Sequence, residues 1–207
     1  MLLLVSGATQ TVKRVSGDSD NIGGLLTPRA GNLSYYTTSG IPWAADNDCF
    51  NGFDENRFMS MLDRMRGSNP TFVTAPDIVG DAMGTLDMFL HWEPVIHSYG
   101  LPIAFVLQDG QEKLCMPWGK LDAVFIGGST DYKLGPEIRW LVREAKWRGK
   151  WVHMGRVNSL QRLSYARDIG CDSVDGTGYS RFPDANIPEA LNFLKHEQIT
   201  LNIDEAL

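Results

Sequence analysis

The sequence is poor in cysteine and has no long hydrophobic segment. Its 207 residues include three cysteines, Cys49, Cys115 and Cys171, which lie far apart and form no Cys-x-x-Cys pair. Such a set argues against a disulfide scaffold and against a structural zinc site. No apolar stretch approaches the length that spans a membrane, and the short apolar run at residues 2–5 resembles a first strand more than a signal peptide. We therefore expect a cytoplasmic protein with no membrane partner.

Charge is also scarce, and it is acidic. Charged residues make up 21% of the chain and the net charge is −6, so no global basic excess indicates nucleic-acid binding, although a local basic patch would still allow it. The hydrophobic content of 43% is enough for a substantial core. No linker, low-complexity run or repeat divides the chain, which predicts one domain over residues 1–207.

A rhythm of short apolar runs, each ending in polar or glycine residues, continues along the whole chain. These runs occupy residues 2–8, 23–29, 41–48, 71–77, 102–110, 122–129, 150–156 and 171–176. Runs that are apolar on both faces are typical of parallel strands covered by helices.

Several of the segments between these runs have helical patterns. In residues 136–149, apolar residues spaced three and four apart form one stripe, with Pro136 suited to the first turn and Gly149 to the stop. Asn158 and Gln161 have the spacing of a capping box for the next helix. Segments 9–22 and 30–40 look irregular. The pattern predicts an α/β fold, a compact (βα)₈ TIM barrel with short outer helices. A doubly wound open sheet is the structural alternative.

Acidic, amide and glycine residues gather where the predicted strands end, the edge at which both folds bind ligands. They are Asp46, Asp48, Asp77, Gln108, Gly127, Gly128 and Asp175. Asp175 suits a nucleophile that attacks an acetal-like carbon, or an Asx turn before Gly176. Asp46 and Asp48 suit a general acid or base, or the cap of the following helix.

The remaining candidates are less specific. Asp77 and Gln108 together suit the edge of a purine, and the Gly127–Gly128 pair exposes backbone N–H groups or forms a tight turn. Phe50 suits stacking on a planar ligand, or core packing. Of the histidines, we expect His153 to point into the barrel and the others to be structural, and no metal-ligand set is visible. Arg156 and Arg181, at strand ends, are placed to meet a phosphate.

The segment 153–181, HMGRVNSLQRLSYARDIGCDSVDGTGYSR, resembles the tRNA-guanine transglycosylase superfamily. Met154 and Gly155 match a Met-Gly strand end, and Asp172, Asp175 and Arg181 match the order and final spacing of the family pattern. The resemblance places Asp175 on the nucleophile and Asp46 on the acid/base residue. It places Phe50, Asp77, Gln108, Gly127 and Gly128, with Met154 and Arg181, on the substrate-binding positions. It implies no metal or redox cofactor.

The departures from the family pattern favour one branch of it. Asn47, Asp48 and Cys49 replace a Ser-Gly-Gly run, so that Asp48 competes with Asp46 for the acid/base role, and the cysteine-rich zinc module of the tRNA enzymes is absent. The chain is similar to the compact DNA 7-deazaguanine transglycosylases of bacteria and phages. The resemblance implies a glycosyltransferase that exchanges guanine in DNA for a free 7-deazaguanine base, such as 7-cyano-7-deazaguanine, in a host cytoplasm if phage-encoded. A protein partner or a homo-oligomer would help an acidic chain to hold DNA.

Three other functions remain open from the sequence. A transglycosylase acting on tRNA keeps the chemistry but lacks the zinc module. A non-catalytic nucleic-acid-binding barrel would leave Asp175, Asp46 and Asp77 without a use. A small-molecule lyase or aldolase often needs a Schiff-base lysine or a metal-ligand set. We expect Lys150, which opens a strand, to lie at the wrong end of the barrel for that role.

Overall fold

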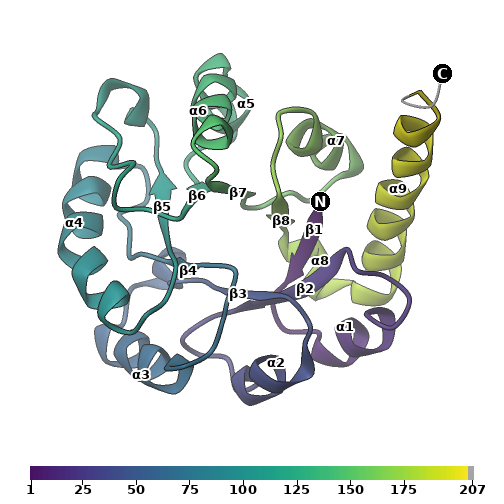
Figure 1. Ribbon diagram of the computed structural model, residues 1–207, viewed down its shortest axis with the longest axis horizontal. Helices are drawn as coiled ribbons and strands as arrows, with labels where there is room; N and C mark the ends of the chain where they lie inside the picture. Colours follow the sequence, from purple (N-terminus) through teal and green to yellow (C-terminus); the bar gives the residue numbers. More distant parts are fainter. Residues whose placement is uncertain (205–207) are drawn as a thin grey trace.

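The protein forms a closed barrel of parallel strands, as seen in a computed structural model that describes the backbone of residues 1–204 and side chains up to Lys195. Within these residues eight strands pair in sequence order, and the last pairs with the first (Figure 1). The strands are β1 (Leu2–Val5), β2 (Ile22–Leu26), β3 (Trp43–Ala45), β4 (Val73–Thr74), β5 (Ile103–Leu107), β6 (Ala123–Ile126), β7 (Trp151–Met154) and β8 (Ser173–Asp175). The predicted (βα)₈ barrel is confirmed, and the open sheet is excluded.

Helices surround the strands in an outer ring (Figure 1). They are α1 (Thr9–Val15), α2 (Leu33–Ser39), α3 (Glu55–Met65), α4 (Ala82–Ser98), α5 (Thr130–Leu134), α6 (Pro136–Trp147), α7 (Leu160–Asp168), α8 (Thr177–Arg181) and α9 (Pro183–Asp204), with short 3₁₀ turns η1 (Cys49–Asn51) and η2 (Gln111–Lys113). None of the described helices has the length and hydropathy that crossing a bilayer requires.

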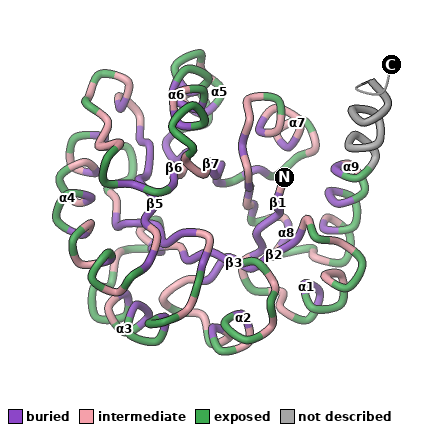
Figure 2. The backbone as a smooth tube through the Cα atoms, in the orientation of Figure 1, coloured by how far each residue is buried: buried purple, intermediate pink, exposed green. Residues whose placement is uncertain are grey.

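The strands separate two apolar cores because successive side chains on a strand point to opposite faces. In β1, Leu2 and Leu4 belong to a small cluster that includes Phe72 and Phe125, whereas Leu3 and Val5 belong to the large cluster that contains the buried faces of the helices. Most residues of the strands are buried (Figure 2), and Phe125, Trp151 and Asp175 are partly exposed. A filled barrel of this kind leaves ligand binding to the loops at its rim.

Several helix predictions need correction. Segments 9–22 and 30–40 are not wholly irregular, because they contain α1 and α2. The N-cap of α7 is Ser159, whose side chain accepts a hydrogen bond from the Arg162 N–H, so Asn158 does not form the expected capping box with Gln161. Asn158 instead accepts from the Gly178 N–H, 2.9 Å away. Helix α6 agrees with its prediction, and its buried stripe begins at Ile138.

The connection from β5 to β6 contains a single 3₁₀ turn, η2, in place of an α-helix. Met116 and Trp118 from this connection pack against the large core cluster and cover part of the barrel that a helix would otherwise cover. The guanidinium of Arg148 lies over the Trp118 ring, 5.3 Å from its centre. The use of a short turn in place of a helix contributes to the short length of the chain.

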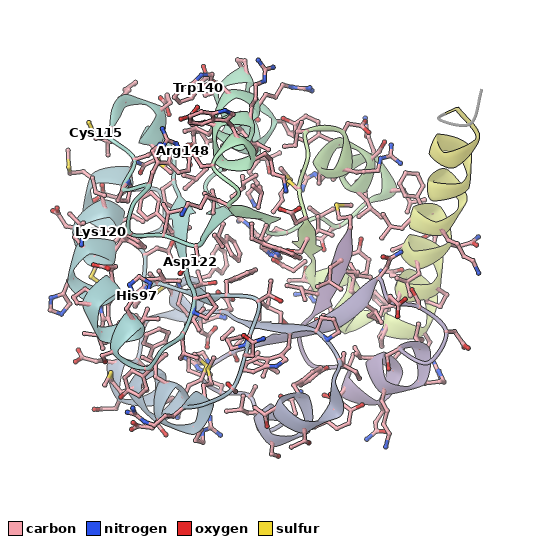
Figure 3. The ribbon with its side chains drawn as sticks, in the orientation of Figure 1. His97, Cys115, Lys120, Asp122, Trp140 and Arg148 are labelled. Atoms are coloured by element: carbon pink, nitrogen blue, oxygen red, sulfur yellow. The ribbon has the colours of Figure 1, made fainter. Side chains whose placement is uncertain are left out.

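His97, one of the histidines that we expected to be structural, takes part in a cluster of surface ion pairs. On α4, His97 Nδ1 lies 2.9 Å from Glu93 and its Nε2 lies 3.3 Å from Asp122. Lys120 donates to the same Glu93, 2.8 Å away. Figure 3 shows His97 and Lys120 on the α4 side of the barrel. The cluster ties α4 to the start of β6, outside the barrel and remote from its interior.

Candidate functional site

A cavity of about 330 Å³ opens at the carboxyl ends of the strands, and residues at or just beyond the end of every strand line it. Eight predicted site residues lie in its wall, namely Asp46, Asp48, Phe50, Asp77, Gln108, Gly127, Gly128 and Asp175. Two others do not line it. Met154 is buried in the large core cluster, and Arg181 ends α8 with an exposed side chain.

Asp175 ends β8 and is held by a chain of hydrogen bonds inside the barrel. His153 Nε2 lies 2.8 Å from Asp175 Oδ2, and His153 Nδ1 lies 2.8 Å from Ser173 Oγ. The indole N–H of Trp151 donates to the same Ser173 oxygen, 2.8 Å away. With the His153 proton on Nε2, every hydrogen in this chain has an acceptor. His153 is fully buried and points into the barrel, as we expected.

Asp46 follows β3 and is the acid whose environment is most altered. Burial raises its pKa to about 7, and the negative charge of Asp175 adds to this, while a hydrogen bond from the Asn47 N–H opposes it. That hydrogen bond is 2.8 Å long. A carboxyl group with this pKa both gives and accepts a proton near neutral pH, which is the property of a general acid or base.

Asp77 is engaged by the neighbouring strand ends. Its two carboxylate oxygens accept from the side-chain amides of Asn47, at 2.7 Å, and Gln108, at 2.6 Å. Burial raises the pKa of Asp77, and these two hydrogen bonds partly oppose the rise. The Gln108 carbonyl oxygen accepts from the Gly80 N–H, 3.0 Å away. We expected Asp77 and Gln108 to bind the edge of a purine. Their polar groups instead form hydrogen bonds that link the ends of β3, β4 and β5.

Two residues at the cavity have left-handed backbone conformations that side chains rarely adopt. Asp48 has φ 61° and Arg156 has φ 60°. Asp48 forms an ion pair with Arg29, 2.9 Å away. The Arg156 guanidinium donates to the Gly128 carbonyl and lies 5.4 Å from the centre of the Phe50 ring. Strained residues of this kind concentrate at functional sites.

Two glycines in the cavity wall lie where a Cβ atom would meet neighbouring atoms. A Cβ atom on Gly155 would lie 2.7 Å from the Phe125 ring and 3.3 Å from Asp175 Oδ2. A Cβ atom on Gly127 would lie 2.8 Å from Val106 and 3.1 Å from the Gln108 amide nitrogen. Both glycines are therefore required by close approach, and Gly155 in particular keeps the space beside Asp175.

Sequence reasoning missed Lys133, which also lines the cavity. Its side chain is 7% exposed, and its Nζ donates to the Gly155 carbonyl, 2.6 Å away. Burial lowers the pKa of Lys133 to about 7; Arg156 contributes to this lowering, and Asp175 opposes it. The sequence feature that could have identified Lys133 is its place in the first helix after the Gly127–Gly128 strand end. Lys150 lies at the opposite end, as expected, and donates to the Leu121 carbonyl.

The cavity wall combines carboxylates with two cations and is not arranged as a metal site. Among the described residues, no group of three or more histidine, cysteine, aspartate or glutamate side chains has the placement to hold a metal ion. The wall offers a proton carrier in Asp46, a second carboxyl group in Asp175, and the basic side chains of Lys133 and Arg156. This combination suits acid–base chemistry on a small polar molecule.

Comparison with known proteins shows the fold. No protein-family model matches the chain, and no curated protein matches it. Similar solved structures include an HpcH/HpaI aldolase from Desulfitobacterium hafniense DCB-2, with 10% identity over 84% of this chain and 85% of that chain and a TM-score of 0.52. A 3-hexulose-6-phosphate synthase shares 13% identity over 95% of this chain and 99% of that chain, with a TM-score of 0.53.

These findings contradict the predicted glycosyltransferase. The two barrels are an aldolase and a hexulose-phosphate synthase, and neither is a transglycosylase. The assignments to DNA modification, to 7-deazaguanine exchange and to the related tRNA reaction are therefore wrong. The physical reason lies in the fold: a (βα)₈ barrel places acids and glycines at its strand ends for many chemistries, so short matches in order do not identify one of them.

Proposed function

We propose that this barrel is an enzyme that moves a proton at a carbon next to a carbonyl group and thereby makes or breaks a carbon–carbon bond in a small, oxygen-rich substrate. The observation that carries the proposal is the placement of Asp46, with a pKa of about 7, in one cavity with Asp175. Proton transfer is most efficient when the pKa of the carrier is close to the working pH.

The size and charge of the cavity support a small anionic or carbonyl-bearing ligand. A volume of about 330 Å³ is at the small end of the range for ligand sites. Arg156 lines the wall together with the acids, so positive charge is available where negative charge develops on a carbonyl oxygen. The fold is one that an aldolase and a hexulose-phosphate synthase also use.

The proposed reaction divides the work between the two acids. In the cleavage direction, the Asp175 carboxylate takes the proton of a hydroxyl group, and the adjacent carbon–carbon bond breaks as that oxygen becomes a carbonyl. The bonding electrons pass to the carbon next to the second carbonyl and form an enolate, whose negative oxygen the Arg156 guanidinium stabilises. Protonated Asp46 then delivers a proton to the enolate carbon.

Deuterium exchange tests this proposal without requiring the natural substrate. The protein is incubated in D₂O with a panel of 2-oxo acids, hydroxyketones and ketose phosphates, and deuterium at the carbon next to the carbonyl is followed by NMR. We expect exchange with at least one compound and a loss of about 10²–10⁴-fold in Asp46→Asn. Asp63→Asn, at an exposed position on α3, is the matched control. No exchange above the buffer rate with any compound contradicts the proposal.

A further inference from the structure

We propose that Lys133 is a nucleophilic amine, which forms an imine with the carbonyl group of the substrate before the carbon–carbon bond changes. This inference rests on the proposed function and assigns it a covalent step. Lys133 extends from α5 toward the carboxyl end of β7, where its Nζ donates to the Gly155 carbonyl, 2.6 Å away. The amine thus lies in the wall of the cavity that holds Asp46 and Asp175.

The surroundings of Lys133 differ from those of a structural lysine. Its side chain is 7% exposed, yet no carboxylate among the described residues lies within ion-pair distance of it, and a carbonyl oxygen is its hydrogen-bond acceptor. Burying an ammonium group without a counter-ion is costly, so the neutral form is favoured. Lys146, by contrast, is partly exposed and pairs with Asp172 at 2.5 Å.

Taken together, the charged groups near Lys133 lower its pKa, as burial also does. Arg156 and Arg162 disfavour the ammonium form, Asp175 and Asp109 favour it, and with burial the pKa of Lys133 falls to about 7. At neutral pH a free amine lone pair is therefore much more accessible on Lys133 than on an ordinary lysine. Desolvation and neighbouring cations are the means by which proteins activate lysine as a nucleophile.

The chemical step balances with groups that line the cavity. The Lys133 Nζ lone pair forms a bond to the carbonyl carbon, and a proton passes from nitrogen to the former carbonyl oxygen. Protonated Asp46 gives a second proton to that oxygen, which leaves as water, and a protonated imine remains on Lys133. The imine nitrogen then accepts the electrons of the breaking carbon–carbon bond in place of the carbonyl oxygen. The product on Lys133 is an enamine, and Asp46, which has regained a proton from water, protonates its carbon and restores the protonated imine. Water then attacks this imine, the carbonyl product and Lys133 are released, and the proton taken by Asp175 returns to solvent.

Reductive trapping tests the inference on the intact protein. The protein is incubated at pH 7 with sodium cyanoborohydride and pyruvate, glyoxylate or dihydroxyacetone phosphate, and modified peptides are mapped by mass spectrometry. At this pH an amine with a pKa of about 7 has a neutral fraction roughly a thousandfold that of an ordinary lysine. We expect at least about tenfold faster labelling at Lys133 than at exposed lysines such as Lys113.

The wild-type map decides the question by itself, since it needs no substitution that could disturb folding. Labelling spread over exposed lysines with Lys133 unlabelled overturns the inference. Lys133→Met should lose the adduct and Lys113→Gln should keep it. Deuterium exchange without an adduct at Lys133 would overturn the amine role and leave proton transfer standing. An adduct at Lys133 without deuterium exchange would support the amine role and contradict the proposed function.

Discussion

His153 Nε2 and Asp175 Oδ2 lie 2.8 Å apart, and the imidazole that makes this contact is fully buried inside the barrel. His153 lies opposite Ser173 in the β7–β8 pairing, and its ring packs between Phe72 and Phe125. The imidazole therefore has one orientation. It holds the Asp175 carboxylate from the barrel interior, and the other side of that carboxylate faces the cavity.

Replacing His153 by Phe should keep the ring and remove both hydrogen bonds. Ser173 then lacks an acceptor for its hydroxyl hydrogen, and Asp175 loses its buried donor. We expect the free energy of unfolding to fall by about 1–3 kcal/mol, measured by urea denaturation, and deuterium exchange to fall with it. His97→Gln, at the partly exposed end of α4, should change stability by less than about 1 kcal/mol. Unchanged activity and stability in His153→Phe would contradict the positioning role.

The pH dependence of stability should report Asp46. The folded protein holds the Asp46 proton up to about pH 7, whereas the unfolded chain releases it near the ordinary value of 3.8. The stability linked to this group is therefore full below about pH 4 and is lost as the pH rises to about 7. Asp46→Asn removes the ionisation, so the variant should gain about 1–3 kcal/mol relative to wild type at pH 8 and less at pH 5.

Denaturation of both proteins across this pH range checks the prediction. Asp63→Asn, whose side chain is 64% exposed, is the control and should give parallel curves. A gap between Asp46→Asn and wild type that is equal at pH 5 and pH 8 would show that Asp46 ionises normally.

Gly155→Ala should disturb the cavity wall. The added methyl group would lie 2.7 Å from the Phe125 ring and 3.3 Å from Asp175 Oδ2. Such overpacking costs typically about 1–3 kcal/mol, and thermal or urea denaturation measures it. Gly119→Ala is the control because nothing lies within 4 Å of its Cβ position. If both substitutions have the same small effect, the close approach at Gly155 is not limiting.

Asn47→Ala should weaken the link between β3 and β4. Asn47 Nδ2 donates to the Ala75 carbonyl and to Asp77 Oδ1, both at 2.7 Å, and its removal leaves these buried acceptors unpaired. We expect a loss of about 1–3 kcal/mol in the free energy of unfolding and a further rise in the pKa of Asp77. Asn51→Ala, at an exposed position, should cost less, and an equal loss in the two variants would contradict this role.

The sequence predicted the barrel well because its strands are short apolar runs with polar or glycine ends. It missed α1 and α2 because these helices bury little: Thr11 and Val12 in the first, Leu33 and Tyr36 in the second. A helix with two buried residues leaves too weak a periodic pattern to recognise. Packing against the barrel, and not local sequence, determines these helices.

The candidate site was predictable to the extent that the strands position it. Asp46 and Asp175 stand at or next to strand ends, so the topology alone brings them to one rim. Lys133 was missed because its side chain reaches back to Gly155 from a helix. The hydrogen bonds of Asp77 with Asn47 and Gln108 were missed because spacing along a chain does not show which polar groups are already satisfied by one another.

The connection from β5 to β6 has no α-helix, and its backbone forms only the short turn η2. An insertion between residues 113 and 120 would leave the strand register intact, because these residues pair with no strand. Lengthening a surface loop costs little entropy. An insertion at this point would therefore lengthen the connection while the eight strands of the barrel kept their pairing.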